Sequence, residues 1–562
     1  MLTQARLGLV LCIIAADLAG LVYLNALRNP FVYDDAVSIV TNPTLRESGN
    51  VAALLLQSRF RPLTNVSYAA DHALWGLDPL GYHVTSVLLH VLSVALLFVL
   101  TFRAVEDWRA RDPAAAARLS PPVAAFAAAA LFAAHPLMTQ AVGYASARAE
   151  VLCAALSLGA LLALRAGLVA ERAGGVALGV SLLALAVAAK EIAVMVPFVA
   201  LAWDRLLLAP GEAARRRLRR VHAPLVAAVV LLGVARLAAF TWIETGTPGA
   251  PRHLLAQPEV IWRYAALLVA PLSQSLVHAV REPARPDAGM LAATAGLLLA
   301  AGTAVGVRRR QPLQALGIAW FLLLLAPSSA VALWEPMAEH RVYLASAGIF
   351  IAAGALLANV FARLEARGPA PRAAALVGFG ALVAVLALAT VARNHVWADP
   401  VGLWRDAAVK APGEWRAHYG LANALAESGR CADAVPVFRR ALWLSPQPYL
   451  WSNLGACLAA EGRPAEARAA YREALALDPR YALAHHNLGM LELRAGDREA
   501  AHLHFLQAIT AQPRDARWRH DLVALYEAKV NDRAKTLELC REIARVAAPS
   551  DAITECIRRN ER

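Results

Sequence analysis

Charged residues are scarce in this sequence. Only 17% of the 562 residues are Asp, Glu, Lys or Arg, whereas 59% are hydrophobic. About 25% of the residues of a typical soluble domain are charged, so the composition excludes an ordinary soluble protein. We therefore expect a membrane protein that crosses the bilayer many times.

The signatures of several common enzyme classes are also missing. The sequence contains no HExxH zinc motif, no GxxxxGKS/T phosphate loop, no dinucleotide fingerprint and no ordered Ser-His-Asp set. Each of these motifs places specific groups around a metal, a phosphate or a nucleophile. What is left for this sequence is acid–base and cation chemistry.

Cysteine is rare as well, with six residues and no CxxC spacing. This argues against a zinc site or a redox motif. Cys540 and Cys556 could pair in an oxidising compartment. Two separate core residues are the simpler interpretation, and the sequence leaves the choice open.

The net charge of +13 does not indicate a nucleic-acid partner. From Pro412 onward there are 21 Lys and Arg against 19 Asp and Glu, and the apolar part before it has 34 against 23. No basic stripe with interleaved aromatic residues occurs. The excess charge belongs to membrane loops, where it orients helices, so we expect membrane lipid and no nucleic acid as a partner.

Apolar runs long enough to cross a bilayer occur about eleven times. The first run is read as a retained helix, because it lacks a small-x-small cleavage site and more spans follow it. The expected spans lie near Leu7–Leu24, Tyr82–Phe102, Val123–Leu137, Val151–Leu168, Val176–Ala189, Ile192–Leu208, Pro224–Thr241, Gly289–Val307, Leu313–Leu333, Leu344–Phe361 and Ala373–Val391.

The loops between these runs differ in charge on the two sides. With the N-terminus in the cytoplasm, every cytoplasmic loop is short and carries arginine, as the positive-inside rule requires. An odd number of crossings places the C-terminal part on the other side. The loops on that side hold Asp34 and Asp35, Arg61, the segment from His135 to Glu150, Lys190 and Glu191, the segment from Glu244 to Asp287, and the segment from Glu335 to Arg341.

Beyond the last apolar run the sequence is polar and repetitive. Pro446, Pro479 and Pro513 are 33 and 34 residues apart, which is the period of tetratricopeptide repeats. Small and bulky residues recur at matching positions, such as Gly455 with Tyr471. We expect an all-α chain with a membrane domain at 1–392, a linker at 393–411, about four repeats at 412–550, of which the last (Trp518 to Pro549) is a degenerate cap, and a tail at 551–562.

The non-cytoplasmic loops supply a carboxylate pair and several cations, which suits sugar transfer from a lipid-linked phosphosugar. One carboxylate, Asp34 or Asp35, would take the proton from the acceptor hydroxyl, and a departing phosphate needs no general acid. Cations neutralise the charge that grows on the phosphate, and Arg does so with two parallel hydrogen bonds. The candidate cations are Arg341, Arg148, Arg61 and Lys190.

Several of these candidates also have a purely structural interpretation. Asp34 and Asp35 can be solvated loop acids that cap the following helix. His135, which precedes a proline, can mark a helix end. Lys190 and Glu191 can form a self-paired polar turn between two apolar helices.

The later polar residues allow similar alternatives. Glu339, His340 and Arg341 lie in a short loop, where charges are ordinary. His83 and His90 are seven residues apart on one helix face. Buried, hydrogen-bonded histidines are the simpler interpretation of this pair than metal ligands.

Several stretches taken together resemble a known family. They are Phe31-Val-Tyr-Asp-Asp-Ala; Phe60-Arg-Pro-Leu-Thr; Gly76-Leu-Asp-Pro-Leu-Gly-Tyr-His83 with Leu89-His90; His135-Pro-Leu-Met-Thr-Gln-Ala-Val142 with Ala147-Arg-Ala-Glu-Val-Leu152; Lys190-Glu191; Glu339-His-Arg-Val-Tyr-Leu344; and the repeats. In this order they resemble the transmembrane and tetratricopeptide-repeat protein O-mannosyltransferases and their bacterial relatives, within the GT-C class of glycosyltransferases. Each motif is short, and the ordered set is what is specific.

The resemblance implies a polytopic GT-C-like helical bundle followed by a repeat superhelix, and it implies roles for residues. In GT-C enzymes the first non-cytoplasmic loop carries the catalytic acid, here Asp34 or Asp35. The Glu-His-Arg loop approaches the lipid phosphate, which places Arg341 first among the cations, with His340 beside it. Further polar candidates are Glu339, His135, Glu150, Glu191 and Tyr343.

Two features depart from the family pattern. Gln140 stands where an acid is expected in the animal members, and the central segment matches only loosely. The identities of the sugar and of the acceptor therefore do not carry over from the resemblance.

The function implied is an inverting glycosyltransferase that moves a sugar, with mannose as the first candidate, from a polyprenyl phosphate to hydroxyl groups of a protein. The repeat groove would bind the acceptor, through residues that the sequence does not identify. No cofactor is predicted, and a divalent metal is left open. The alanine- and arginine-rich composition suggests a bacterial inner membrane, an undecaprenyl donor and periplasmic repeats.

Two other functions stay open. The repeats could recruit envelope or secretion partners as a non-enzymatic scaffold that the bundle anchors, although one helix would be a sufficient anchor. A closer alternative keeps the enzyme and gives it a glycan or lipid acceptor.

Overall fold

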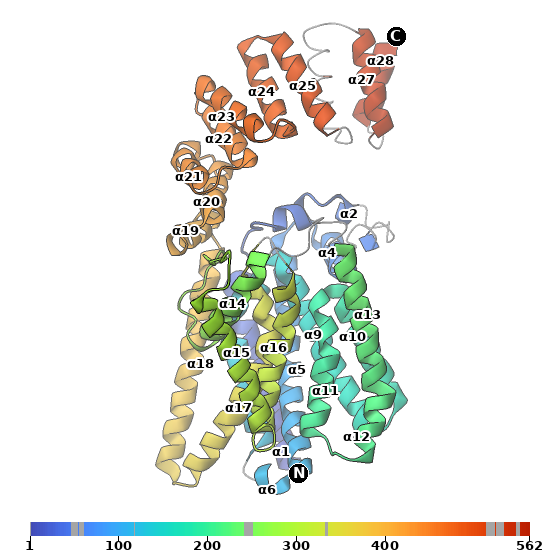
Figure 1. Cartoon of the computed structure of the whole chain (residues 1–562), viewed down its shortest axis with the longest axis vertical. Coiled ribbons are helices and arrows are strands. Elements are labelled where there is room, and N and C mark those ends of the chain that lie inside the picture. Colours follow the sequence, from blue (N-terminus) through green and yellow to red (C-terminus); the bar gives the residue numbers. More distant parts are fainter. Residues whose placement is uncertain are drawn as a thin grey trace. The chain divides into compact units, whose positions relative to one another are not determined.

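The computed structural model describes residues 2–46, 54–55, 61–116, 119–240, 251–331, 335–512, 523, 533–546 and 551–561. All regular secondary structure in these ranges is helical, which confirms the predicted all-α fold. The chain divides into two compact units, residues 1–403 and 404–562 (Figure 1). Each unit has buried hydrophobic clusters of its own.

The first unit is a bundle of long apolar helices. By length and composition, eight helical segments of the described chain suffice to cross a membrane, and a bent pair makes a ninth. The bent pair consists of α7 (Pro121–Ala134) and the segment Pro136–Gly143, with 56° between them. The helices of the eight are α1 (Leu2–Leu21), α5 (Pro79–Arg111), α9 (Arg148–Val169), α13 (Ala223–Phe240), α15 (Ala288–Val307), α16 (Pro312–Ala330), α17 (Tyr343–Glu365) and α18 (Pro369–Trp397).

The two other predicted spans correspond to helices too short to count among these nine. The run Val176–Ala189 lies in α10 (Ala173–Ala189), which has 17 residues. The run Ile192–Leu208 is divided between a 3-10 turn, η5 (Glu191–Met195), and α11 (Val196–Leu207), which has only 12 residues. Pro197 lies in the first turn of α11, where a proline needs no hydrogen-bond donor. The break places Lys190 and Glu191 at one end of the bundle.

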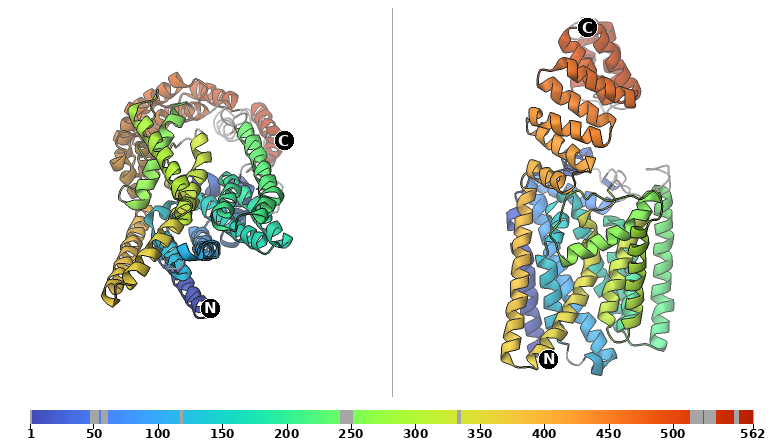
Figure 2. Two further views of the ribbon diagram at one scale, coloured as in Figure 1. Left: turned by 60° about the horizontal axis from the view of Figure 1, so that its bottom comes forward. Right: turned by 60° about the vertical axis from the view of Figure 1, so that its left-hand side comes forward.

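Close helix packing in the bundle depends on small residues. A Cβ atom on Gly354 of α17 would collide with the backbone of Ala124 in α7, and one on Gly317 of α16 would lie 2.5 Å from the carbonyl oxygen of Gly348. Small residues let backbones approach closely, which is how helices associate where no hydrophobic effect operates between them. The segment just after α1 meets the end of α18, the last helix of the bundle (Figure 2), where Asn394 donates to the carbonyl oxygen of Val22 at 2.9 Å.

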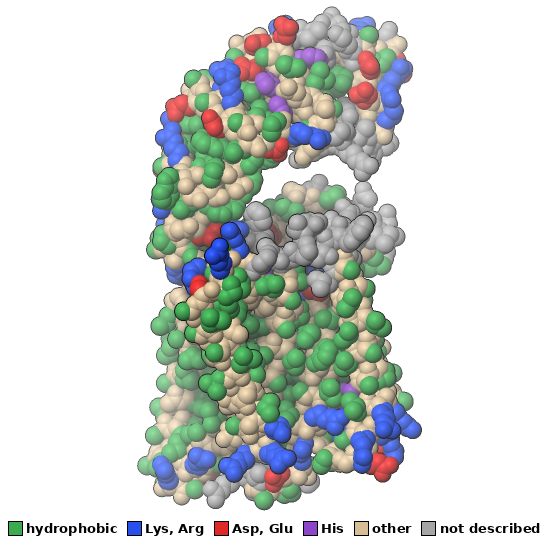
Figure 3. All heavy atoms as spheres, in the orientation of Figure 1, with side chains coloured by type: hydrophobic (Ala, Val, Ile, Leu, Met, Phe, Trp, Pro, Cys, Tyr) green, Lys and Arg blue, Asp and Glu red, His purple; other side chains and the backbone are tan. Residues whose placement is uncertain are grey.

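The two ends of the bundle differ in polarity. Lys and Arg side chains gather at the end where the N-terminus and α12 (Glu212–Arg217) lie (Figure 3). At the opposite end the first loop forms α2 (Pro43–Arg46) and α4 (Pro62–Trp75) (Figure 1). Neither of these helices, nor α14 (Pro251–Val269) in the central segment, was expected from the apolar runs, because they are too polar or too short to resemble spans.

The second unit is a series of helical hairpins. The pairs match the predicted repeats, because Gly455 and Gly489 face the rings of Tyr471 and Phe505, which leave no room for a Cβ atom. Most of the fourth predicted repeat, and Pro513, lie outside the described residues. The helices are α19 (Pro400–Lys410), α20 (Trp415–Glu427), α21 (Cys431–Leu444), α22 (Pro448–Ala460), α23 (Pro464–Leu477), α24 (Ala482–Ala495), α25 (Arg498–Ala511), α27 (Arg533–Val546) and α28 (Asp551–Glu561).

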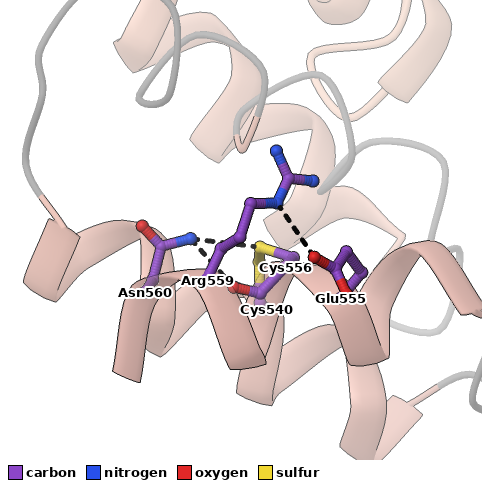
Figure 4. The surroundings of a disulfide bond; sticks show 5 residues. All are labelled: Cys540, Glu555, Cys556, Arg559 and Asn560. Carbon is purple, nitrogen blue, oxygen red and sulfur yellow. Dashed lines mark hydrogen bonds and ion pairs between the residues drawn. A yellow bond between two sulfur atoms is a disulfide. The ribbon is translucent and has the colours of Figure 1, made fainter. Parts of the chain in front are cut away.

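The segments expected as linker and tail are helical. Residues 393–411 hold the end of α18 and all of α19, and Trp404 of α19 packs directly on Gly420 of the first repeat. Residues 551–561 form α28, which a disulfide between Cys540 and Cys556 ties to α27 (Figure 4). The interpretation of these cysteines as two separate core residues is therefore wrong. Spacing in the sequence does not reveal that their Cα atoms lie 6.3 Å apart.

Candidate active site

The two neighbouring aspartates of the first loop have opposite surroundings. Asp35 is fully buried. Its Oδ1 accepts hydrogen bonds from the backbone N–H and the hydroxyl of Ser146 at 2.7 and 2.6 Å, and its Oδ2 accepts the N–H of Val32 at 3.0 Å. Burial raises the pKa of Asp35 to about 6, against these hydrogen bonds, which favour the ionised form. Asp35 therefore fastens the first loop to the start of α9.

Asp34 faces the solvent instead. Its backbone N–H donates to the hydroxyl of Tyr144 at 3.0 Å. The preceding residue, Tyr33, has a φ of 54°, a left-handed conformation that is uncommon for a residue with a side chain. Of the two aspartates, Asp34 is therefore the one that is open to solvent.

A second group of charges comes from three separate segments at this end. Lys190 forms an ion pair with the buried Glu150. His340 Nε2 lies 3.9 Å from Glu150 Oε1, and the backbone N–H of His340 donates to Gln140 Oε1 at 2.8 Å. Within the described chain, Glu150 Oε2 and His340 Nδ1 are buried and have no hydrogen-bond partner. A ligand or water that bonded to these two atoms would remove the cost of leaving them unpaired.

Two arginines complete this end of the bundle. Arg61 makes a two-pronged ion pair with Glu191, at 2.8 and 3.2 Å. Arg341 donates to the carbonyl oxygen of Glu335 at 2.8 Å, and the carboxylate of Glu335 accepts the hydroxyl of Tyr33 at 3.0 Å. Arg341 is thus two contacts away from the residue that precedes Asp34.

Other predicted residues have structural surroundings. Arg148 is fully buried, forms an ion pair with Asp71 at 2.5 Å and donates to the carbonyl oxygen of Tyr82 at 2.8 Å. Its guanidinium also lies over the rings of Tyr68 and Tyr82. A phosphate would have to displace this whole set of partners, so we leave Arg148 out of the donor-binding group.

His135 and Tyr343 are likewise engaged in the protein interior. His135 Nδ1 accepts the N–H of Leu137 at 3.2 Å and its Nε2 lies 3.1 Å from the carbonyl oxygen of Leu268, so the ring caps a helical turn. The hydroxyl of Tyr343 lies 2.6 Å from His90 Nδ1. The helix-end interpretation of His135 is confirmed.

The surroundings of His83 and of Lys190 and Glu191 decide between the interpretations that the sequence left open for them. His83 Nε2 lies 3.0 Å from the carbonyl oxygen of Asn29, which confirms the interpretation of a buried, hydrogen-bonded histidine. The self-paired interpretation of Lys190 and Glu191 is wrong, because each pairs with an acid or base of another segment.

Glu339 is buried beneath the Glu-His-Arg loop and fastens that loop to the central segment. Its carboxylate accepts the backbone N–H of Ser275 at 2.6 Å and an amide N–H of Gln274 at 3.2 Å, and His278 Nε2 lies 2.9 Å away. These contacts hold His340 and Arg341 in position. Glu339 itself points away from solvent.

Sequence reasoning missed the residues that orient the Asp pair. Tyr144 and Ser146 lie inside a stretch that resembles the family, but an isolated hydroxyl carries no signal in a single sequence. Glu335 was included only as the edge of a loop. No group of three or more metal-binding side chains occurs in the described ranges.

Comparison with known proteins gives two kinds of match. Tetratricopeptide repeat family models match residues 386–449 and 447–514. Among solved structures, a tetratricopeptide protein of Thermus thermophilus has a TM-score of 0.26 at 18% identity and covers 32% of this chain and 94% of its own. YrrB, described as having an unusual peptide-binding site, has a TM-score of 0.24 at 19% identity and covers 33% of this chain and 91% of its own.

Curated relatives match the membrane part as well. A Caenorhabditis elegans protein O-mannosyl-transferase is 24% identical over 468 residues, which cover 77% of this chain and 62% of that protein. The Mus musculus protein O-mannosyl-transferase TMTC1 is 32% identical over 176 residues, 28% of this chain and 17% of that protein. The chain thus spans less than two thirds of these relatives. The resemblance drawn from the motifs is confirmed: the chain is similar to the TMTC protein O-mannosyl-transferases over both its membrane part and its repeats.

Proposed function

We propose that this protein is an integral-membrane glycosyltransferase that transfers a sugar, mannose in the first instance, from a polyprenyl phosphate to hydroxyl groups of a protein. The single observation that best supports the proposal is the link from Asp34 to Arg341. A solvent-facing carboxylate and a cation from a distant segment are joined through Tyr33 and Glu335. A base beside a phosphate-binding cation is the arrangement that this transfer needs.

In the proposed reaction, Asp34 takes the proton of the acceptor hydroxyl. The oxygen of the acceptor attacks the anomeric carbon, while the bond from that carbon to the phosphate oxygen breaks. The electron pair leaves with the phosphate, which is already anionic and needs no proton. Attack opposite the departing phosphate inverts the configuration at the anomeric carbon.

Asp35 would not react in this scheme. Its oxygens already accept three hydrogen bonds, and it has no exposed surface. Its task is to hold the loop, so that Asp34 keeps its place next to the substrate. Fixed geometry of this kind can contribute several kcal/mol to a reaction between bound groups.

Arg341 is the first candidate to hold the donor phosphate. Among the described residues its side-chain hydrogen bond goes to a neutral carbonyl group, whereas Arg61 and Lys190 are paired with carboxylates. The phosphate would compete with Glu191 and Glu150 for these two cations. His340 would contribute a hydrogen bond through its unpartnered Nδ1. A divalent metal and any cofactor stay outside the proposal.

The arginine-rich end of the bundle would face the cytoplasm. The opposite end, with Asp34, and the repeats would then be outside the cytoplasm, in the periplasm of a bacterium with an undecaprenyl donor. The disulfide between Cys540 and Cys556 supports this side for the repeats, because disulfides persist in oxidising compartments.

The repeats would bind the acceptor protein. Helices α20 and α22, the first helices of two successive repeats, carry an aromatic cluster of Trp415, Tyr419 and Tyr449, with ring centroids 5.2 to 6.4 Å apart. Aromatic rings of this type bind peptides at little entropic cost. Loss of residues 404–562 would then abolish transfer to protein, whereas an enzyme with a glycan or lipid acceptor would keep its activity.

The test is transfer of label from tritiated undecaprenyl phosphate mannose to protein, in membranes that contain the full chain or its Asp34→Asn variant. Asp78→Asn is the matched control, because Asp78 is an exposed acid that caps α5 and Asn caps a helix equally well. The proposal expects label with the wild type and the control, and none with Asp34→Asn. Equal labelling by all three would contradict it.

A further inference from the structure

A stack of three aromatic rings lies beside Asp34, and each ring comes from a different segment. Tyr144, between α8 (Thr139–Gly143) and α9, stacks on Tyr33 with ring centroids 6.3 Å apart and 22° between the planes. Tyr144 also stacks on Trp397, the last residue of α18, with ring centroids 5.6 Å apart and 26° between the planes. Tyr144 and Trp397 are both buried. The ring of Tyr144 is therefore held by two stacked rings from other segments.

The hydroxyl of this stacked ring meets Asp34. It accepts the backbone N–H of Asp34 at 3.0 Å. A tyrosine hydroxyl can accept and donate at the same time. Partial burial raises the pKa of Asp34, and the side chain of Tyr144 acts against this rise. Tyr144 thus contacts both the backbone and the side chain of this residue.

One short turn contacts both aspartates. Tyr144 and Ser146 flank Ala145 in η4 (Ala145–Ala147) and bond to Asp34 and Asp35 respectively. The turn is itself fixed, since the hydroxyl of Tyr68 donates to the carbonyl oxygen of Ala145 at 3.0 Å. Ser146 therefore holds the carboxylate of Asp35, and Tyr144 holds the backbone of Asp34.

We infer that Tyr144 is the positioning residue of the base: it holds the backbone of Asp34 and so orients the carboxylate toward the acceptor hydroxyl. The inference rests on the proposed function. It adds that the orientation of the base depends on Trp397, at the end of the last helix of the bundle, because Trp397 stacks on the Tyr144 ring.

Two further acids are connected to the segment that carries Asp34. Asp35 is the adjacent residue, and Glu335 accepts a hydrogen bond from the hydroxyl of Tyr33, which precedes Asp34. Both are acids, and a nearby negative charge disfavours ionisation of a carboxyl group. A hydrogen-bond donor on Asp34 favours the ionised form, so its removal should move the pKa of the base upward.

The experiment measures kcat, KM and the pH dependence of transfer for Tyr144→Phe, with tritiated undecaprenyl phosphate mannose as donor. The variant keeps the stacked ring and removes only the hydroxyl. We expect kcat to fall about tenfold or more, since orientation and proton transfer are both affected, with the KM of the donor within about twofold of the wild type. The acidic side of the pH profile of kcat (the acid limb) should move to higher pH, by on the order of half a pH unit to one unit.

Tyr68→Phe is the matched control, because it removes a buried hydroxyl from the same turn but not from Asp34. We expect it to lower thermal stability without moving the acid limb. The position of the limb does not depend on how much protein is folded, so it can be measured even where Tyr144→Phe reduces the yield.

The outcomes separate this inference from the proposed function. Loss of transfer in Asp34→Asn together with wild-type kcat and pH dependence in Tyr144→Phe would overturn the inference alone. Unchanged transfer in Asp34→Asn would overturn the proposed function. A shift of the limb in Tyr144→Phe but not in Tyr68→Phe supports the positioning role.

Discussion

At the arginine-rich end of the membrane unit, the acids are enclosed by donors. Asp107 accepts both prongs of Arg165, at 2.5 and 2.9 Å, and the indole N–H of Trp203 at 3.0 Å. Asp204 accepts both prongs of Arg217 at 2.8 Å, and His222 Nε2 lies 2.9 Å away. In both groups the two carboxylate oxygens of the acid are occupied by donors from other segments, so these acids hold helices together.

The opposite end uses the same residue types but leaves some of them incomplete. Asp34 faces solvent, Glu150 has an oxygen without a partner in the described chain, and Arg341 bonds to a carbonyl oxygen. Residue type alone therefore does not separate a site from a scaffold. Whether the charges are fully compensated does, because an uncompensated buried group has a cost that a bound ligand can relieve.

The largest effect should come from Asp34→Asn. Without a base the acceptor hydroxyl keeps its proton, and we expect transfer to fall about 10²- to 10⁴-fold. The thermal midpoint should stay close to that of the wild type, because the side chain is exposed. Transfer assays and thermal unfolding on one detergent-solubilised preparation check both statements. A large loss of stability would make Asp34 a structural residue.

Arg341→Gln should give the next largest effect. It removes the cation that we place on the donor phosphate, and we expect kcat/KM for the donor to fall about 10- to 100-fold. Arg341→Lys should restore part of the activity, because it keeps the charge but not the two-pronged geometry. Titration with the donor at fixed acceptor measures this. Equal activity of Arg341→Gln and wild type would remove Arg341 from the site.

Asp107→Asn should lower stability and leave transfer unchanged, which is the opposite of Asp34→Asn. It leaves Arg165 largely buried beside a neutral group, and breaking a buried ion pair costs about 3 to 5 kcal/mol. We expect a lower thermal midpoint and less folded protein, while transfer per folded molecule stays at the wild-type level. Size-exclusion chromatography with the transfer assay separates the two quantities. A loss of transfer per folded molecule would mean that this end also takes part in the reaction.

Asp35→Asn should give the smallest effect, which is a change in how the stability of the protein depends on pH. Its pKa of about 6 exceeds the value in an unfolded chain, so the folded protein binds the proton more tightly. Stability from this group is then present below about pH 4 and is lost as the pH rises through about 6. We expect the thermal midpoint to decline from pH 5 to pH 7 and the decline to be flatter in Asp35→Asn. Parallel slopes for the two proteins would contradict the raised pKa.

The sequence predicted features that depend on neighbours along the chain. The apolar runs mark the long helices, and the spacing of Pro446 and Pro479 marks the repeats, because both patterns are local. The first loop shows the limit. Asp34 and Asp35 are adjacent, and what separates them is the turn at Tyr33 and the hydroxyl groups of residues more than a hundred positions away.

Pairing across the fold could not be predicted. Arg148 and Arg341 both lie in short polar motifs. Arg148 is enclosed by Asp71 and aromatic rings, whereas Arg341 is partly exposed. Lys190 and Glu191 are neighbours that pair with different segments. Lys190 pairs with Glu150 and Glu191 pairs with Arg61, and only the folded bundle brings these segments together.

The most direct test of this account compares Asp34→Asn with Asp107→Asn in one preparation, with two quantities measured for each: transfer per folded molecule and the thermal midpoint. The account predicts that Asp34→Asn loses transfer at an unchanged midpoint, and that Asp107→Asn keeps transfer at a lowered midpoint. The reverse pattern, or an equal loss of transfer in both variants, would contradict the assignment of the active site to the end of the bundle that carries Asp34.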